Sequence, residues 1–327
     1  MSPLSTEAPM PEAHSPCPIC PLPDWGVLKI SGEDAARFLQ GQATCDVLAL
    51  TPGAMGCGAF CTPKGRVLAN FRIARGREAI YLFLARELVE PLQKRLQLYV
   101  LRAKVQLENL NGHTSLHALP GFDNAEALGA MGITPTDLAA DWNELPDLGV
   151  LKLERGAVTD YWLMTPADAG DKPSLAHATL PADAWRLRDI EAGFPLIRAA
   201  TQEEFLPQML NLDCLGGTSF TKGCYTGQEI VTRTHFLGQI KRRMFRLTCP
   251  GTMELHPGTA VVEVEGDTSK TAGQIVNACR NETGDYECLA VLSLEYADSP
   301  HLHADSAEGP RLSRLPLPYS LEATGGA

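Results

Sequence analysis

The chain has 327 residues, of which 44% are hydrophobic and 20% are charged, and its formal net charge is −11. This length predicts two or three domains, because one domain usually has about 100 to 200 residues. The composition is that of a soluble globular protein. It excludes a helical membrane protein, because no apolar run approaches the roughly 18 residues that span a bilayer.

The first residues are rich in proline and lack the basic segment followed by an apolar core of a secretory signal. We expect residues 1–22 to be a flexible extension and the protein to be cytoplasmic, where its ten cysteines stay reduced. The pair Cys17 and Cys20 and the looser pair Cys57 and Cys61 lack the spacing and context of a zinc or redox site. We therefore expect no metal site.

Basic residues gather between Lys64 and Lys104, where ten of them stand among three acidic residues. A second basic run covers residues 241–243, and Arg246 follows it closely. Such patches attract a phosphate backbone or a small polyanion, although a solvated face is the commoner explanation. The negative charge of the whole chain leads us to expect only weak contact with tRNA.

In the first part of the chain, the sequence pattern predicts strands mixed with two helices. Residues 54–60 and 67–73 are strand-like runs joined by the turn sequence Thr62-Pro63-Lys64-Gly65, which predicts a hairpin. Apolar residues at 88, 89, 92, 96 and 99 predict a helix over 87–100. The other predicted elements are strands over 25–30, 79–84 and 105–110, a short helix that ends at Gly41, and a weaker strand, helix, strand order between 113 and 180.

The second part of the chain begins with a predicted helix over 185–191 that ends at Gly193. Residues 202–217 lack regular periodicity, and we expect them to wrap over a neighbouring domain. From about residue 243, short apolar runs alternate with Gly, Pro, Asn and Asp turns, which predicts a small all-β domain.

The stretch KGCYTGQE at 222–229 has the spacing of a capping box, with Thr226 as the first residue of a helix that runs to about His235 and ends before Gly238. Cys224 would then lie near the positive end of the helix dipole and close to Lys222, and both effects favour the thiolate. The alternative is an ordinary capped helix beside a buried, inert cysteine.

Three stretches together resemble one family: Ile190–Pro195, Lys222–Glu229 and Pro316–Leu321. They are similar to the YgfZ family of folate-binding proteins, which are relatives of the aminomethyltransferase (T-protein) of the glycine cleavage system. The resemblance implies an α+β fold in which three domains form a ring around a central folate channel. Two interleaved α/β domains and a C-terminal small β-barrel domain make up that ring.

The implied domains are discontinuous in sequence. Residues 23–50 and 113–200 would form the first domain, and residues 51–112 and 201–242 the second, which carries the KGCYTGQE stretch. Residues 243–327 would form the C-terminal β domain.

The resemblance also assigns site residues. Tetrahydrofolate or a one-carbon derivative would be bound by Trp25, Asn70, Trp185 and Glu191, since a pterin needs an apolar wall and a few directed polar groups. Without the family, each tryptophan would be read as a core anchor and Glu191 as a surface charge. Cys224 would be the reactive thiol with Lys222 holding it ionised, and the remaining residues of the stretch would shape the loop: Gly223, Tyr225, Thr226, Gly227, Gln228 and Glu229.

One departure from the T-protein pattern bears on catalysis. The T-protein has a Gly-Gly-x-x-Asp-Asp segment, and the matching stretch here runs from Gly65 to Ala69-Asn70. Asparagine can hydrogen-bond a pterin but cannot act as a general base. We therefore do not expect the glycine cleavage reaction. Cys224 replaces an aspartate of the T-protein and adds a nucleophilic thiol.

The resulting hypothesis is a monomeric tetrahydrofolate-binding protein that assists assembly or repair of iron-sulfur clusters, and thereby tRNA thiomethylation. Its partners would be folate and iron-sulfur enzymes or assembly factors. Three alternatives stay open: a folate-dependent one-carbon transferase of the aminomethyl type, a direct tRNA-binding module, and a scaffold with folate as a structural ligand.

Overall fold

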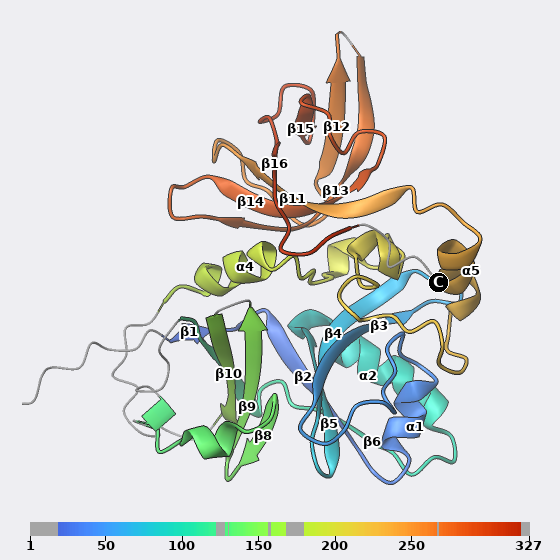
Figure 1. Cartoon of the computed structure of the whole chain (residues 1–327), viewed down its shortest axis with the longest axis vertical. Helices are drawn as coiled ribbons and strands as arrows, with labels where there is room; N and C mark the ends of the chain where they lie inside the picture. The colour runs from blue at the N-terminus through green and yellow to red at the C-terminus, as the bar shows by residue number, and fades with distance from the viewer. Residues whose placement is uncertain are drawn as a thin grey trace, which may run out of the picture.

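The computed structural model describes residues 19–121, 128–129, 131–155, 158–167, 180–266 and 268–321. Its strands form three antiparallel sheets. Two sheets lie side by side below helix α4 (Ala182–Glu191), and the third lies above it (Figure 1). The fold is a mixed α/β structure in which sheets predominate, in agreement with the predicted class.

The first sheet has five strands in the order β3-β4-β5-β2-β6. Its inner strands are buried along almost their whole length, because both faces of the sheet are covered: eight of the nine residues of β4 are buried, including the polar side chains of Asn70 and Arg72. The predicted hairpin is confirmed, since β3 and β4 pair and the Gly65 amide donates to the Thr62 carbonyl at 2.9 Å. The strands are β2 (Trp25–Ser31), β3 (Met55–Cys61), β4 (Val67–Arg75), β5 (Ala79–Ala85) and β6 (Gln106–Asn109).

Helix α2 (Arg86–Val100) packs on β2, β5 and β6. The predicted helix is confirmed, with one of its expected core positions shifted: Tyr99 is 42% exposed, and Val100 is buried instead. The spacing of three and four residues between Leu88, Leu92 and Leu96 keeps these side chains on one face. The shorter helix α1 (Ala35–Gln40) ends at Gly41, as predicted.

The second sheet has the order β1-β7-β10-β9-β8. Cys20 and Pro21 pair with β7, so residues 19–22, which were expected to belong to the extension, are part of the fold. Residues 1–18, with Cys17, lie outside the described part. The strands are β1 (Cys20–Pro21), β7 (Thr114–Leu119), β8 (Trp142–Leu145), β9 (Leu148–Arg155) and β10 (Val158–Pro166), and the 3₁₀ turn η1 (Pro135–Leu138) precedes β8.

The sheets divide the chain differently from the expected domains. β2 pairs with β5 from Trp25 opposite Ala85 to Ser31 opposite Ala79, and it also pairs with β6. Residues 25–31 therefore belong to the sheet built from residues 55–109, and not to the sheet formed by residues 114–166. The two sheets nevertheless share one hydrophobic core, which contains all four tryptophans.

The third sheet has six strands, in the order β15-β12-β13-β14-β11-β16, and its own core. Its short strands between turns agree with the all-β prediction for this part of the chain. α4 packs on β13 and β14, so this helix lies between the third sheet and the other two (Figure 1). The strands are β11 (Arg242–Cys249), β12 (Ala260–Glu265), β13 (Thr268–Arg280), β14 (Tyr286–Ser293), β15 (Leu302–Ala304) and β16 (Ser313–Leu315).

The segment between α4 and the KGCYTGQE stretch is irregular apart from two 3₁₀ turns, η2 (Ala199–Thr201) and η3 (Pro207–Leu210). Residues 202–217 were expected to wrap over a neighbouring domain, and they contact both β4 and β11. The Val67 amide donates to the Phe205 carbonyl at 2.8 Å, and the Asn211 side chain donates to the Met244 carbonyl at 2.8 Å. None of the helices in the described ranges has the length and hydropathy of a membrane-spanning segment.

Candidate functional site

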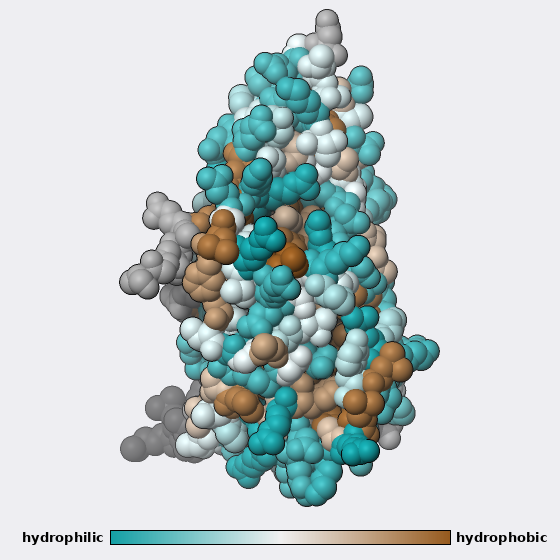
Figure 2. Space-filling model, turned by 90° about the vertical axis from the view of Figure 1, so that its right-hand side faces the viewer, coloured by the Kyte–Doolittle hydropathy of each residue, from teal (hydrophilic) through white to brown (hydrophobic). Residues whose placement is uncertain are grey.

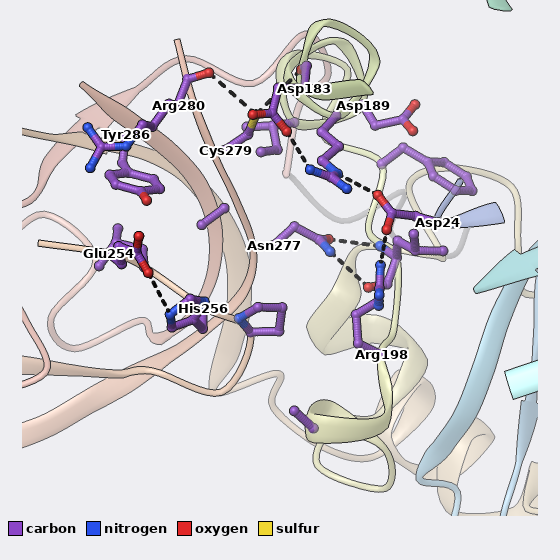
Figure 3. Close-up of a pocket in the computed structure, with 18 of the residues that line it drawn as sticks. Asp24, Asp183, Asp189, Arg198, Glu254, His256, Asn277, Cys279, Arg280 and Tyr286 are labelled. Atoms are coloured by element: carbon purple, nitrogen blue, oxygen red, sulfur yellow. Dashed lines mark hydrogen bonds and ion pairs between the residues drawn. The ribbon is translucent and has the colours of Figure 1, made fainter. Parts of the chain in front are cut away.

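A cleft of about 740 Å³ lies between α4 and the third sheet (Figure 3). Its volume falls in the range of about 300–1,000 Å³ that is typical of small-molecule sites. Five parts of the chain line it: Asp24 and Trp25 at the start of β2, Glu87 of α2, α4 with the following residues 194–200, the loop 254–257, and residues of β13 and β14.

Trp25, the first residue of β2, is only 3% exposed and lies at the edge of the apolar wall of this cleft. The wall continues into Phe194, whose ring centroid lies 6.3 Å from that of Trp25. Behind both rings lies the buried guanidinium of Arg72, at 3.8 Å from the Phe194 centroid and 4.8 Å from the Trp25 centroid. The wall is therefore held in place by a cation that stacks on its inner side.

Asp24 places a carboxylate beside Trp25. It pairs with Arg186, and its Oδ1 lies 3.0 Å from Nη1 of Arg198 (Figure 3). Arg198 in turn binds Glu87 at 3.0 Å. Burial by itself raises the pKa of Asp24, but the hydrogen bonds and charges of the two arginines outweigh it, so the pKa lies below its ordinary value. Asp24 is therefore ionised at neutral pH.

Asp189 on α4 lines the cleft and is the centre of a buried network that extends into the core. Its Oδ1 accepts hydrogen bonds from Arg72 at 2.7 Å and from Arg155 at 2.9 Å, and its Oδ2 accepts one from Nε1 of Trp185 at 2.9 Å. Trp185 is 1% exposed and does not line the cleft. The network ties α4 to both lower sheets and fixes the position of the cleft wall.

The two predicted polar ligands, Asn70 and Glu191, lie elsewhere. The Asn70 amide donates to the Pro195 carbonyl at 2.6 Å, and its oxygen accepts from the Ile197 amide at 2.8 Å. Both the nitrogen and the oxygen of this side-chain amide therefore hydrogen-bond to the backbone, and Asn70 anchors the segment that carries Phe194. Glu191 does not line the cleft; its carboxylate lies 3.6 Å from Nη2 of Arg246.

The third sheet contributes the opposite wall of the cleft. Asn277 exchanges two hydrogen bonds of 2.8 Å with the Leu196 backbone and so clamps the sheet to the segment after α4 (Figure 3). Burial raises the pKa of the Cys279 thiol to about 12, so this cysteine stays protonated. Arg280 stacks on Tyr286 at 4.6 Å.

The KGCYTGQE stretch leads into α5 (Gln228–Phe236), which ends before Gly238 as predicted. The predicted capping box is wrong. The N-terminal cap is Gly227 with φ +83°, and no side chain caps this end of the helix. The reason is tertiary packing. Gly227 lies directly against Thr62 and Gly65 of the β3–β4 turn, so a side chain at this position would collide with the turn.

Replacing Gly227 by alanine is expected to destabilise the protein by at least about 1–2 kcal/mol, the cost of a left-handed backbone for an L-residue. An added Cβ would also overlap the Thr62 carbonyl and meet the Gly65 backbone at 2.9 Å. Gly223→Ala is the matched control, because a Cβ there meets nothing within 4 Å. Urea denaturation measures both. Equal midpoints for the two variants would contradict the packing described here.

Lys222 is buried, and its ammonium group donates to the carbonyls of Gln40, Ala43 and Cys45 at 2.6, 2.7 and 2.8 Å. Burial lowers the pKa of Lys222 to about 8. Each of the three ammonium protons is donated to a backbone carbonyl. Lys222 therefore anchors the KGCYTGQE stretch to residues 40–45. The expected pairing of this ammonium with the Cys224 thiol is not formed.

Cys224 is exposed and does not line the cleft. Cys224 is therefore not the buried cysteine of the alternative interpretation. Its neighbour Tyr225 is buried, and burial raises the pKa of this phenol. Thr226 is half-buried, Gln228 donates to the Lys222 carbonyl at 3.4 Å, and Glu229 is exposed and does not reach back to cap the loop.

The face that carries α5 is largely hydrophilic, with apolar side chains in separate places (Figure 2). At the end of α5, Phe236 is 59% exposed and Leu237 is 85% exposed. The structure thus separates the predicted site into two parts. One is the cleft with Trp25, and the other is the exposed thiol of Cys224 at the start of α5.

No family model matches this chain. Curated relatives do. The chain is 31% identical over 335 residues to "tRNA-modifying protein YgfZ" of Escherichia coli, covering 98% of this chain and 99% of the relative. The proteins of the same name from Edwardsiella ictaluri and Sodalis glossinidius are 32% and 30% identical, each with 98% of both chains covered.

The chain belongs to the YgfZ family. Among solved structures, it is similar to the glycine cleavage system aminomethyltransferase T from Bartonella henselae, with a TM-score of 0.70, 15% identity, and coverage of 93% of this chain and 86% of the other. This member of the YgfZ family therefore has a T-protein-like fold, as the sequence predicts.

Three charged residues of this YgfZ-family site were missed by sequence reasoning: Asp24, Asp189 and Arg72. Asp24 could have been found, since it directly precedes Trp25. Asp189 lies two residues before Glu191 in a stretch already singled out, but the partner that defines its role is 117 positions away in sequence. No local pattern marks a pairing over that distance.

Proposed function

We propose that this protein binds tetrahydrofolate or a one-carbon derivative in the cleft beside Trp25. The observation that supports this most is the combination of the cleft's volume with an aromatic wall and an ionised carboxylate at one end. A pterin is a flat heteroaromatic ring whose aminopyrimidine edge donates hydrogen bonds, and such a wall and carboxylate suit it.

The residues present fit this ligand. Each oxygen of Asp24 pairs with one arginine, and a carboxylate can accept about four hydrogen bonds, so Asp24 can also accept from the ligand edge. The lining contains five carboxylates and three guanidinium groups, which favours a ligand that is rich in hydrogen-bond donors at one end and anionic at the other. Arg280, on the wall formed by the third sheet, is suited to the anionic end.

The other predicted folate ligands have supporting roles in this proposal. Trp185 orients Asp189, and Asn70 holds the backbone of residues 195–197 and with it the wall residue Phe194. Glu191 is replaced by Asp24 as the pterin ligand. Position 70 carries no carboxylate that could take a proton, so we do not propose aminomethyl transfer from glycine.

We further propose that the exposed thiol of Cys224 acts on partner proteins at the surface, in assembly or repair of iron-sulfur clusters, and that tRNA thiomethylation depends on this activity. The names of the relatives, which are tRNA-modifying proteins, support the link to tRNA modification. Lys222 and Gly227 then position Cys224 by anchoring the loop on either side of it. We place the protein in the cytoplasm as a monomer, with direct tRNA contact weak.

Filling the cleft tests the proposed site. Ala200 is exposed and lines the cleft, so Ala200→Trp places a large side chain there without disturbing the core. We expect it to weaken tetrahydrofolate binding by about 1.4 kcal/mol or more, at least about tenfold. Ala49→Trp, at an exposed position outside the cleft, is the control and should bind like the wild type. Equilibrium dialysis measures both, and wild-type affinity in Ala200→Trp would place the ligand elsewhere.

A further inference from the structure

Helix α5 carries exposed apolar side chains at the end opposite to Cys224. Phe236 and Leu237, which are mostly exposed, follow one another there. Single apolar side chains scattered over a surface are normal, whereas a group of large ones is characteristic of an interaction site. The helix lies at the edge of the molecule, so a partner can reach both of its ends (Figure 1).

The Phe236 ring is held in place by two other rings. Phe220 and His235 stack with their ring centroids 3.7 Å apart, and Phe236 packs edge-on against them at 6.0 and 4.7 Å. The Leu237 amide donates to the Arg233 carbonyl at 3.0 Å and ends the helix. Both apolar residues are therefore fixed on the surface, which lowers the entropy cost of binding a partner there.

A third exposed apolar side chain lies near these two. Residues 238–241 connect α5 to β11, and four residues span at most about 14 Å. The Lys241 carbonyl accepts a hydrogen bond from the Leu294 amide at 2.9 Å, and Leu294 is 46% exposed. One partner can therefore contact Phe236, Leu237 and Leu294 together, and we call these three side chains the α5 surface.

Four exposed cations lie on the elements around the α5 surface. Arg233 is on α5, Lys241 and Arg242 are at the start of β11, and Lys64 is in the β3–β4 turn, which packs against α5. None of the four forms an ion pair with a described residue, whereas the neighbouring Arg243 does. These four charges therefore remain available to a partner.

The charge at this surface is opposite to that of the chain. Two exposed carboxylates, Glu229 of α5 and Glu295 beside Leu294, stand against the four cations. The whole chain has a net charge of −11. A local excess of positive charge steers an acidic partner to this side of the molecule.

We propose that the α5 surface docks a partner protein whose own apolar contact is surrounded by acidic side chains, and that docking places this partner at Cys224. The inference rests on the proposed function, in which the Cys224 thiol acts on partner proteins. Helix α5 has nine residues and is about 14 Å long, and Cys224 precedes it by four residues. An interface of about 800 Å² per partner is wide enough to cover both ends.

A protein fits this surface better than RNA does. Unpaired bases bind mainly by stacking on open aromatic faces. Here Phe220 and His235 stack on each other, and Leu237 and Leu294 offer no ring. An aromatic anchor with aliphatic neighbours and a charged rim is instead the usual composition of a protein–protein contact.

Two substitutions test the surface in a strain that lacks its own YgfZ-family protein. Leu237→Glu adds a negative charge to the apolar contact, and Arg242→Glu reverses one of the cations. In both variants we expect thiomethylated tRNA to fall toward the level of the strain without any family member. Leu98→Glu on α2 and Lys270→Glu on β13 are the matched controls, because both side chains are exposed and outside this surface, and they should match the wild type.

Two measurements separate weakened docking from damage to the chain. Leu237 is 85% exposed, so Leu237→Glu should keep the wild-type thermal midpoint and the wild-type rate of Cys224 alkylation by iodoacetamide. Overproduction of Leu237→Glu should restore thiomethylation, since a weakened complex re-forms at higher concentration. Overproduction of Cys224→Ser should not. A lowered midpoint or alkylation rate in Leu237→Glu would place the defect in the chain itself and overturn the docking role.

The remaining outcomes distinguish this proposal from the proposed function. Wild-type thiomethylation in Leu237→Glu, with loss in Cys224→Ser, removes the docking surface and keeps the thiol. The reverse result keeps the surface and removes the thiol. If the wild-type chain itself does not restore thiomethylation, both fail. Purified tRNA that binds the wild type but neither Leu237→Glu nor Arg242→Glu would assign the surface to RNA and overturn the proposal.

Discussion

Replacing Asp189 by asparagine is expected to lower the free energy of unfolding by about 3–5 kcal/mol, the usual cost of removing one partner from a buried ion pair. The side chains of Arg72 and Asp189 are only 5% and 9% exposed. In the variant, the buried guanidinium of Arg72 loses its counter-charge and Arg155 loses one of its partners. Urea denaturation followed by circular dichroism measures the change.

A double-mutant cycle shows whether the pair is the cause. Arg72→Met alone should also destabilise, and the double variant with Asp189→Asn should lose less than the sum of the two, because the two residues are in contact. Glu90→Gln breaks an ion pair in which both side chains are mostly exposed, so it should leave the midpoint unchanged. A loss below about 1 kcal/mol in Asp189→Asn would mean that the pair behaves like a surface ion pair.

If the proposed iron-sulfur function is correct, Cys224→Ser should abolish support of iron-sulfur enzymes in cells while leaving the thermal stability of the protein unchanged. The side chain is exposed, so the substitution removes a thiol without altering the core. The measurement is the level of thiomethylated tRNA in a strain that lacks its own YgfZ-family protein and carries the variant. The level should fall to that of the strain without any family member.

Cys214→Ser provides the comparison for that experiment. This cysteine is half-buried, and burial raises the pKa of its thiol, so it should stay protonated and its replacement should retain function. Full function in Cys224→Ser would remove the thiol from the proposal.

Elements with a strong local pattern could be predicted from the sequence. The β3–β4 hairpin follows from the turn sequence between two apolar runs, and α2 follows from the spacing of its leucines. The cap of α5 could not. Thr226 has the correct chemistry for a cap, but Gly227 takes this position because the β3–β4 turn packs directly against it, and that contact joins residues about 160 positions apart.

The same limit applies to the site. Trp25 was expected at the folate site from the family resemblance, and it lines the cleft. Asn70 was expected to face a ligand, yet its side-chain amide is hydrogen-bonded to the backbone of residues 195–197. The sequence shows which polar groups exist, but it does not show which of them the fold has already paired. Asp24 keeps acceptor capacity facing the cleft, whereas Asn70 does not.

The measurement that tests the account most directly is calorimetric titration of tetrahydrofolate into the purified protein and its Trp25→Ala variant, in reducing buffer. We expect saturable binding to the wild type, weakened in the variant by about 1–3 kcal/mol, the usual contribution of one aromatic stacking partner. Trp25→Phe keeps a ring at the wall and should retain most of the affinity, which controls for misfolding. Absence of binding to the folded wild type, or equal affinity in Trp25→Ala, would contradict a folate site in this cleft.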